Sequence, residues 1–275
     1  MLDATWAEYW RTPGDRALLR VYADALDEAG DPRGKFIQLS LVENRTPEQQ
    51  LALDRLAKKS KGDLIGPAKA FLRETVFGPD GLVMKARAEA EQVIAGIAEI
   101  SALNPRLILT ITSVKSEKLA KELGKISLGK IYFVDFGCIT GRHGNGCRIS
   151  DKQLAALAPA LADVEHLQLS LAGSAAGRAE DSPTPAGFRA LGTHLERLRF
   201  LACDYYVGSP MPPAEDYADA IRETPGFSTL EAIEFPSMQQ RDLPGVKVNQ
   251  LVANQQSTAI LRSDTAAKVE SLFRS

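Results

Sequence analysis

Residues 164–169 read VEHLQL, and residues 230–235 read LEAIEF. Both have apolar side chains at relative positions 1, 4 and 6, and the same spacing occurs in LGKIYF at 128–133 and in LERLRF at 195–200. Because successive side chains of a strand point to opposite faces, this spacing predicts short strands with one buried face. The four segments begin 36, 31 and 35 residues apart, which predicts a repeated structural unit.

Helical segments separate these strands. They read ISDKQLAALAPALAD at 149–163, PTPAGFRALGTH at 183–194 and PPAEDYADAIRETPG at 212–226. One strand with its helix cannot bury its apolar face alone, so neighbouring units are expected to stack and form a common core. The clearest repeats span residues 128–240. Less regular strands are expected at 81–88, 104–111 and 246–255, with further helices at 89–101, 116–124 and 264–273.

The first 75 residues lack this strand spacing and predict a helical domain. Asp15 is expected to cap a helix that Gly30 ends, because a short carboxylate accepts bonds from free N–H groups and glycine tolerates the left-handed turn. Thr46 is expected to cap another helix, with Pro47 at its first position. The sequence therefore predicts two domains, a helical one at 1–75 and a strand–helix one at 76–275.

Two stretches of this helical domain carry a resemblance to a known family. They are VYADALDEAGD at 21–31 and DPRGKFIQL at 31–39. Both resemble the small repeat-companion domain, which occurs in large paralogous sets in myxobacteria and planctomycetes and often precedes leucine-rich repeats. The resemblance implies a bacterial protein and an architecture, but no activity. Asp31 and Arg33 are expected to fix a turn between helices, Gly34 to allow close approach, and Asp24 to bond Arg33 or Arg20.

The strand spacing L-x-x-L-x-L resembles leucine-rich repeats, and the long helical returns resemble the ribonuclease-inhibitor-like class. That class usually has Asn or Cys at position 9, and in the alignment above only Cys203 matches. The resemblance implies an α/β fold in which the N-terminal helical domain is followed by an irregular leucine-rich-repeat strand–helix solenoid with a curved parallel sheet.

The segment CITGRHGNGCRISD, residues 138–151, contains candidate metal ligands. Cys138, His143 and Cys147 have the spacing C-x4-H-x3-C, and zinc favours thiolate and imidazole ligands in sets of four. A tight C-x2-C knuckle is missing, and the fourth ligand would have to be Asp135, Asp151 or Cys203. We expect an inserted loop with one buried cysteine and no cofactor. A metal site, or an enzyme built on this segment, stays open as an alternative.

A strand–helix solenoid exposes the strand side chains that lie between the buried positions, and these are the expected binding residues. On the strands they are Tyr132, Asp135, His166, Gln168, Arg197, Arg199 and Glu234. Tyr205 and Tyr206 add aromatic side chains from an inserted loop. Tyr and Arg commonly anchor protein interfaces, so we expect a non-enzymatic module or adaptor that binds another protein. A structural subunit of a larger assembly is the alternative.

Bulk composition excludes some partner classes. The formal net charge is -2 with a pI near 6.0, which argues against nucleic acid as a partner. No apolar run reaches the ~18 residues of a membrane helix, so no membrane partner is expected. The three cysteines are expected to be reduced thiols, and with the acidic N-terminus they predict a cytoplasmic protein.

Overall fold

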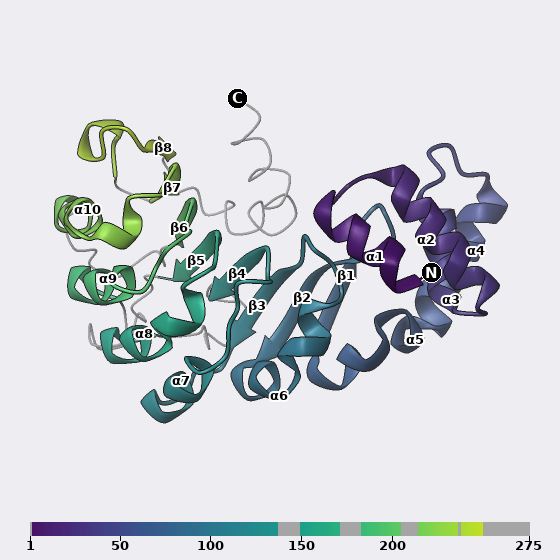
Figure 1. The fold of residues 1–275 in the computed structure, drawn as a ribbon, viewed down its shortest axis with the longest axis horizontal. Helices are drawn as coiled ribbons and strands as arrows, with labels where there is room; N and C mark the ends of the chain where they lie inside the picture. The colour runs from purple at the N-terminus through teal and green to yellow at the C-terminus, as the bar shows by residue number, and fades with distance from the viewer. Residues whose placement is uncertain (1, 137–148, 171–182, 205–213, 236–237, 250–275) are drawn as a thin grey trace. The chain divides into compact units, whose positions relative to one another are not determined.

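A computed structural model describes residues 2–136, 149–170, 183–204, 214–235 and 238–249. Within these ranges the chain forms ten α-helices and a mostly parallel sheet of eight strands (Figure 1). The predicted α/β class is therefore confirmed. The chain divides into an N-terminal unit, Met1–Arg87 with Ala98–Leu107, and a C-terminal unit, Ala88–Ile97 with Ile108–Ser275.

The N-terminal unit is built mainly from helices. They are α1 (Leu2–Arg11), α2 (Arg16–Glu28), α3 (Pro32–Ser40), α4 (Pro47–Lys59) and α5 (Lys61–Ile65), followed by a 3-10 turn at Gly66–Phe71. The unit also contains strand β1 (Glu74–Phe77), which the sequence did not predict, and most of β2 (Val83–Glu89), its antiparallel neighbour. The predicted boundary after residue 75 therefore falls inside β1.

The predicted helix starts of this unit are confirmed. The Asp15 carboxylate accepts hydrogen bonds from the backbone N–H groups of Ala17 and Leu18 at 2.8 and 3.1 Å. The Thr46 hydroxyl accepts from the backbone N–H of Gln49 at 3.2 Å, and the Gln49 side chain accepts from the Thr46 N–H at 2.9 Å. This reciprocal pair is a capping box, which satisfies donors at the helix start that have no partner within the helix.

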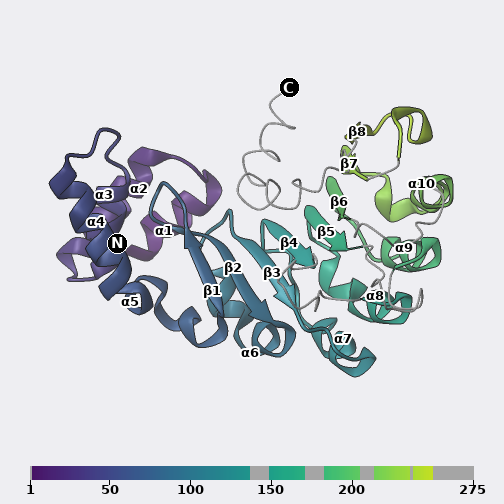
Figure 2. The ribbon, with the colours of Figure 1, turned by 180° about the vertical axis from the view of Figure 1, so that it is seen from behind.

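The strands of the C-terminal unit lie side by side in chain order and are parallel. They are β3 (Ile108–Thr112), β4 (Phe133–Phe136), β5 (His166–Ser170), β6 (Phe200–Asp204), β7 (Ala232–Glu234) and β8 (Lys247–Asn249). The helices between the strands are α7 (Glu117–Leu123), α8 (Asp151–Leu157), α9 (Pro185–Gly192) and α10 (Ala214–Glu223), preceded by α6 (Ala90–Ser101). Helices α7 to α10 pack each against the next on one side of the strands (Figures 1 and 2). The predicted helix at 264–273 lies outside the described residues.

The strand register shows a more regular repeat than the sequence predicted. Val134 lies opposite Leu167, Leu167 opposite Leu201, and Leu201 opposite Ile233. Three positions before each of these stands a buried apolar residue, namely Ile131, Val164, Leu198 and Leu230. Their spacings are 33, 34 and 32 residues, so the unit is nearly constant in length.

The predicted alignment was therefore wrong by three residues in two of the four segments. Positions 4 and 6 are Val134 and Phe136 in the first segment, and Leu201 and Cys203 in the third. The cause is an additional buried leucine three residues earlier in each, Leu128 and Leu195. Apolar spacing alone cannot separate the two registers, since each supplies leucine, isoleucine or valine at positions 1 and 4. Cys203 consequently stands at position 6 and not at position 9.

Within the C-terminal unit, side-chain hydrogen bonds join neighbouring strand–helix segments near the starts of the helices. The Gln153 amide of α8 donates to the backbone carbonyl of Val114 at 2.9 Å. The Tyr217 hydroxyl of α10 donates to the carbonyl of Pro183 at 2.7 Å, and the Tyr217 side chain is buried. These bonds give polar partners to buried backbone groups where one unit stacks on the next.

Candidate binding surface

A row of charged side chains lies where β5, β6 and β7 begin. Glu165, Arg199 and Glu231 each directly precede a strand. The N–H of Arg199 donates to the Glu165 carbonyl at 2.9 Å, and the N–H of Glu231 donates to the Arg199 carbonyl at 2.8 Å. These backbone bonds place the three side chains at equivalent points of successive units. We call Glu165, Arg197, Arg199 and Glu231 the charged row.

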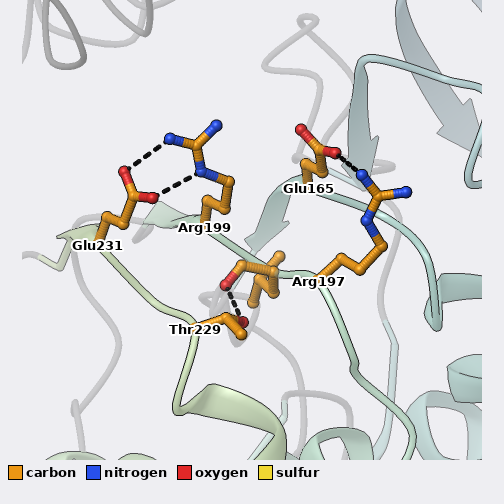
Figure 3. Close-up of polar contacts among 6 residues, drawn as sticks. Glu165, Arg197, Arg199, Thr229 and Glu231 are labelled. Carbon is orange, nitrogen blue, oxygen red and sulfur yellow. Dashed lines mark hydrogen bonds and ion pairs between the residues drawn. The ribbon is translucent and has the colours of Figure 1, made fainter.

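The charged row forms two ion pairs between successive strand–helix segments of the C-terminal unit (Figure 3). Arg199 binds Glu231 through two atoms, with Nε 2.7 Å from Oε1 and Nη2 3.0 Å from Oε2. These hydrogen bonds raise the pKa of the Arg199 guanidinium. Arg197 Nη2 lies 2.5 Å from Glu165 Oε1, and 59% of the Arg197 side chain is exposed. All four side chains are thus open to solvent to a substantial degree, which confirms the expected exposure of Arg197 and Arg199.

Figure 3 also shows a hydrogen bond beneath the row, from the Thr229 hydroxyl to the carbonyl of Leu198 at 2.8 Å. Leu198 itself is fully buried. The bond joins the residues that lead into β7 to those that lead into β6. It therefore fixes the backbone between Arg197 and Arg199. A fixed backbone lowers the conformational freedom that the charged row would lose on binding.

His166 is buried, against the prediction of an exposed side chain, with 3% of its surface exposed. Its Nδ1–H donates to the backbone carbonyl of Tyr132 at 2.8 Å, and its ring lies 4.5 Å from the Tyr132 ring. The Phe133 ring stacks at 6.4 Å on the same imidazole. Burial lowers the pKa of His166, although the Tyr132 carbonyl and the charge of Glu165 act in the opposite direction.

Gln168 and Glu234 are also buried, at 9% and 2% exposure. The reason is that their face of the sheet carries apolar residues of its own, which pack as a cluster of Ile108, Phe133, Phe200, Ala202 and Ala232. The sequence predicted a single buried face, and the structure buries side chains on both. Asp135 is half-buried on this face and accepts a hydrogen bond from the Thr110 hydroxyl at 2.8 Å.

The remaining predicted site residues lie outside the described residues. These are Tyr205 and Tyr206 of the predicted binding loop, and Cys138, His143 and Cys147 of the candidate metal segment. In the ranges that the structure describes, no three His, Cys, Asp or Glu side chains come together as a metal site. In those same ranges, no helix has both the length and the apolar character needed to cross a bilayer.

The predicted turn in the N-terminal unit is confirmed, with one change of partner. The Arg33 guanidinium donates to both carboxylate oxygens of Asp31, with Nε 3.0 Å from Oδ1 and Nη2 2.5 Å from Oδ2. Burial opposes ionisation of Asp31, but the hydrogen bonds and charge of Arg33 outweigh it and lower the pKa of Asp31. Asp24 accepts instead from the Gln38 amide at 2.7 Å. A Cβ at Gly34 would overlap backbone atoms of α2, so the close approach is real.

A cavity that was not predicted from the sequence lies within the N-terminal unit. Its volume is about 450 Å³, and its walls include Trp6, Tyr22 and Phe36. The aromatic residues near the start of the chain were a signal, since Trp6 and Tyr9 lie one helical turn apart. Read alone, they indicated only the apolar face of a short helix.

No family model, curated protein or solved structure matches the chain. The function is therefore inferred from the chain's own residues.

Proposed function

We propose that this protein is a non-enzymatic protein–protein interaction module, in which a helical domain of the repeat-companion type precedes a leucine-rich-repeat-like solenoid. The nearly constant unit length supports the solenoid, because stacked repeats need matching strands and helices. The parallel register from β3 to β8 supports it as well. The partner is another protein, and the charged row is the surface that it contacts.

The observation that carries this proposal is the exposure of the charged row at equivalent points of successive units. Exposed ion pairs add only about 0–1 kcal/mol to stability, so the row adds little to the fold. Arginine on a fixed backbone is, by contrast, a frequent anchor of protein interfaces. Arg197 uses only Nη2 in its ion pair with Glu165. Its Nε and Nη1 donors therefore remain available to a carboxylate, which favours an acidic segment of the partner.

A photo-cross-linking amino acid placed at a single position tests the proposal in the native host. Position 197 reports on the charged row, and position 121 on α7 is the matched control, since the Lys121 side chain is 62% exposed. We expect one protein to be cross-linked from 197 and not from 121. Cross-linked proteins that are the same for both positions would indicate non-specific contact and would contradict the proposal.

The cross-linked protein, once identified, is then purified and titrated with this chain. We expect Arg197→Glu to weaken the Kd by 10-fold or more, the order of a hot-spot arginine. Lys121→Glu should leave the Kd within about 2-fold, since it lies outside the row. An unchanged Kd in Arg197→Glu would remove the charged row from the interface. Sedimentation that shows a stable homo-oligomer, without any partner, would favour the structural-subunit alternative.

A further inference from the structure

The cavity of the N-terminal unit has the size and walls of a small-molecule site. Its volume of about 450 Å³ falls within the ~300–1,000 Å³ that such sites commonly have. The walls come from α1, α2, α3, α5 and the turn after it, the start of β2 and residues 98–103. Most lining side chains are apolar, and the polar exceptions are few. The residues that define its chemistry are Trp6, Tyr22, Arg33, Phe36, Ala98 and Glu99.

Flat aromatic rings form one wall of the cavity. The Trp6 and Tyr22 rings stack with their centres 4.7 Å apart and their planes at 24°. The Tyr9 ring also stacks with Trp6, with the ring centres 5.5 Å apart, and Tyr9 is fully buried. Such stacking fixes the plane of the indole. A fixed planar wall favours a ligand that is itself a flat ring.

The Tyr22 hydroxyl supplies a hydrogen-bonding group that the protein does not use. Tyr22 as a residue is 9% exposed, and its hydroxyl oxygen is still reached by solvent. Among the described residues, none accepts from or donates to this hydroxyl. Burial raises the pKa of Tyr22, so the hydroxyl keeps its proton at neutral pH and can donate.

The charges around the cavity favour a neutral ligand. Arg33 reaches the lining, but its guanidinium is bound through two atoms to Asp31. The pair is neutral as a whole, so it gives little attraction to an anion. Glu99 lies exposed at the rim and adds a negative charge there, which disfavours anions further.

We propose that the cavity of the N-terminal unit binds a neutral, flat ring compound that carries an oxygen acceptor, with the ring against Trp6 and the acceptor on the Tyr22 hydroxyl. This site is separate from the charged row, and it does not depend on the proposed protein partner. It gives the helical domain a binding activity of its own.

The tryptophans of the chain provide a direct readout. Both of them, Trp6 and Trp10, lie in α1, so a Trp10→Phe variant of the full chain fluoresces from the cavity wall alone. The probes are 6-bromocoumarin, which has a ring carbonyl, and 2-bromonaphthalene, which has similar shape without an acceptor. Bromine quenches tryptophan on contact. We expect saturable quenching by 6-bromocoumarin at one probe per chain.

Tyr22→Phe in the same background tests the hydrogen bond. We expect it to weaken the binding of 6-bromocoumarin about 10-fold, which is the order expected for the loss of one hydrogen bond. Binding of 2-bromonaphthalene should change less than about 2-fold, because it makes no such bond. Equal effects on the two probes would overturn the role of Tyr22.

Ala98→Phe tests the position of the site without disturbing the core. Ala98 lines the cavity and is exposed on α6. A phenylalanine at this position can therefore extend across the opening of the cavity without displacing core residues. We expect weaker quenching by both probes with an unchanged unfolding temperature. Linear, non-saturating quenching that neither Tyr22→Phe nor Ala98→Phe alters would show that the probes only partition onto the surface, and would overturn the proposal.

Discussion

Asp151 accepts two hydrogen bonds from Thr184, which lies 33 residues further along the chain. The backbone N–H of Thr184 lies 2.7 Å from Oδ1, and its hydroxyl lies 2.5 Å from Oδ2. The same hydroxyl accepts from the N–H of Ala186 at 3.2 Å and so caps α9. The first residue of α8 is therefore hydrogen-bonded to the residue that caps α9. This links local helix capping to the packing of α8 against α9.

We predict that Asp151→Ala destabilises the protein by about 2–3 kcal/mol, because it removes two hydrogen bonds to a charged acceptor. The control is Ser116→Ala at the cap of α7, where the hydroxyl accepts only a local bond from Leu119. Loss of an ordinary cap costs about 1 kcal/mol. Urea unfolding measures both. An Asp151→Ala effect no larger than that of Ser116→Ala would mean that the link between units adds nothing to the cap.

The ion pair between Arg197 and Glu165 should contribute little to stability. Both side chains are partly exposed, so we predict a coupling free energy of about 0.2–1 kcal/mol in a double-mutant cycle with alanine. The measurement is urea unfolding of the two single variants and the double variant. Raising the ionic strength to about 1 M should shrink the coupling, since exposed charges are then screened. A salt-independent coupling above about 2 kcal/mol would assign the pair to the fold and not to a binding surface.

Local features were predictable from the sequence because their causes are local. Asp15 and Thr46 cap helices as predicted, and the Asp31–Arg33 turn forms between residues two positions apart. The strand register depends on the whole sheet, and Leu128 or Ile131 could equally well begin the pattern. Only the pairing of neighbouring strands separates these two options.

The candidate site was predictable only in part. The exposed arginines followed from their charge, whereas the burial of His166 and Glu234 did not. That burial accompanies an apolar cluster whose members come from four different strands. The cavity near Trp6 was not foreseen for a similar reason, since α1, α2, α3 and residues 98–103 enclose it jointly.

Gly226 marks a tight contact between neighbouring units, and we predict that Gly226→Ala destabilises the protein by about 1–3 kcal/mol, the range of overpacking in a dense interior. A Cβ at this position would overlap the carbonyl oxygen of Gly192 and lie 2.7 Å from that of Leu195. Backbone atoms cannot rotate away as a flexible side chain does. Thermal or urea unfolding gives the difference.

Gly30→Asn is the matched control for the loss of a glycine. Gly30 has a φ of +74° and nothing within 4 Å of an added Cβ, and asparagine tolerates this left-handed conformation better than most residues. We expect a cost below about 1 kcal/mol. Equal costs at positions 30 and 226 would show that backbone freedom, and not the contact with Gly192, determines the effect.

His166 should make the stability of the protein depend on pH below neutrality. Burial lowers its pKa in the folded state, while the unfolded chain has the ordinary value near 6.5. Above that value both states are neutral and His166 contributes no pH dependence. As the pH falls below about 6.5, the unfolded state takes up the proton first, so the free energy of unfolding decreases.

The test compares the wild type with His166→Gln in urea unfolding from pH 7.5 to pH 5. Carboxylates titrate in both proteins, so the informative quantity is the difference in unfolding free energy between them. The charges near the imidazole are those of Glu165, Arg199 and Glu231, and they are the same in both proteins. We expect any advantage of the wild type over His166→Gln to decrease steadily as the pH falls. A difference that stays constant across this range would mean that the imidazole titrates alike in the folded and unfolded chain, and that its burial beside Tyr132 and Phe133 has no energetic consequence for the proton.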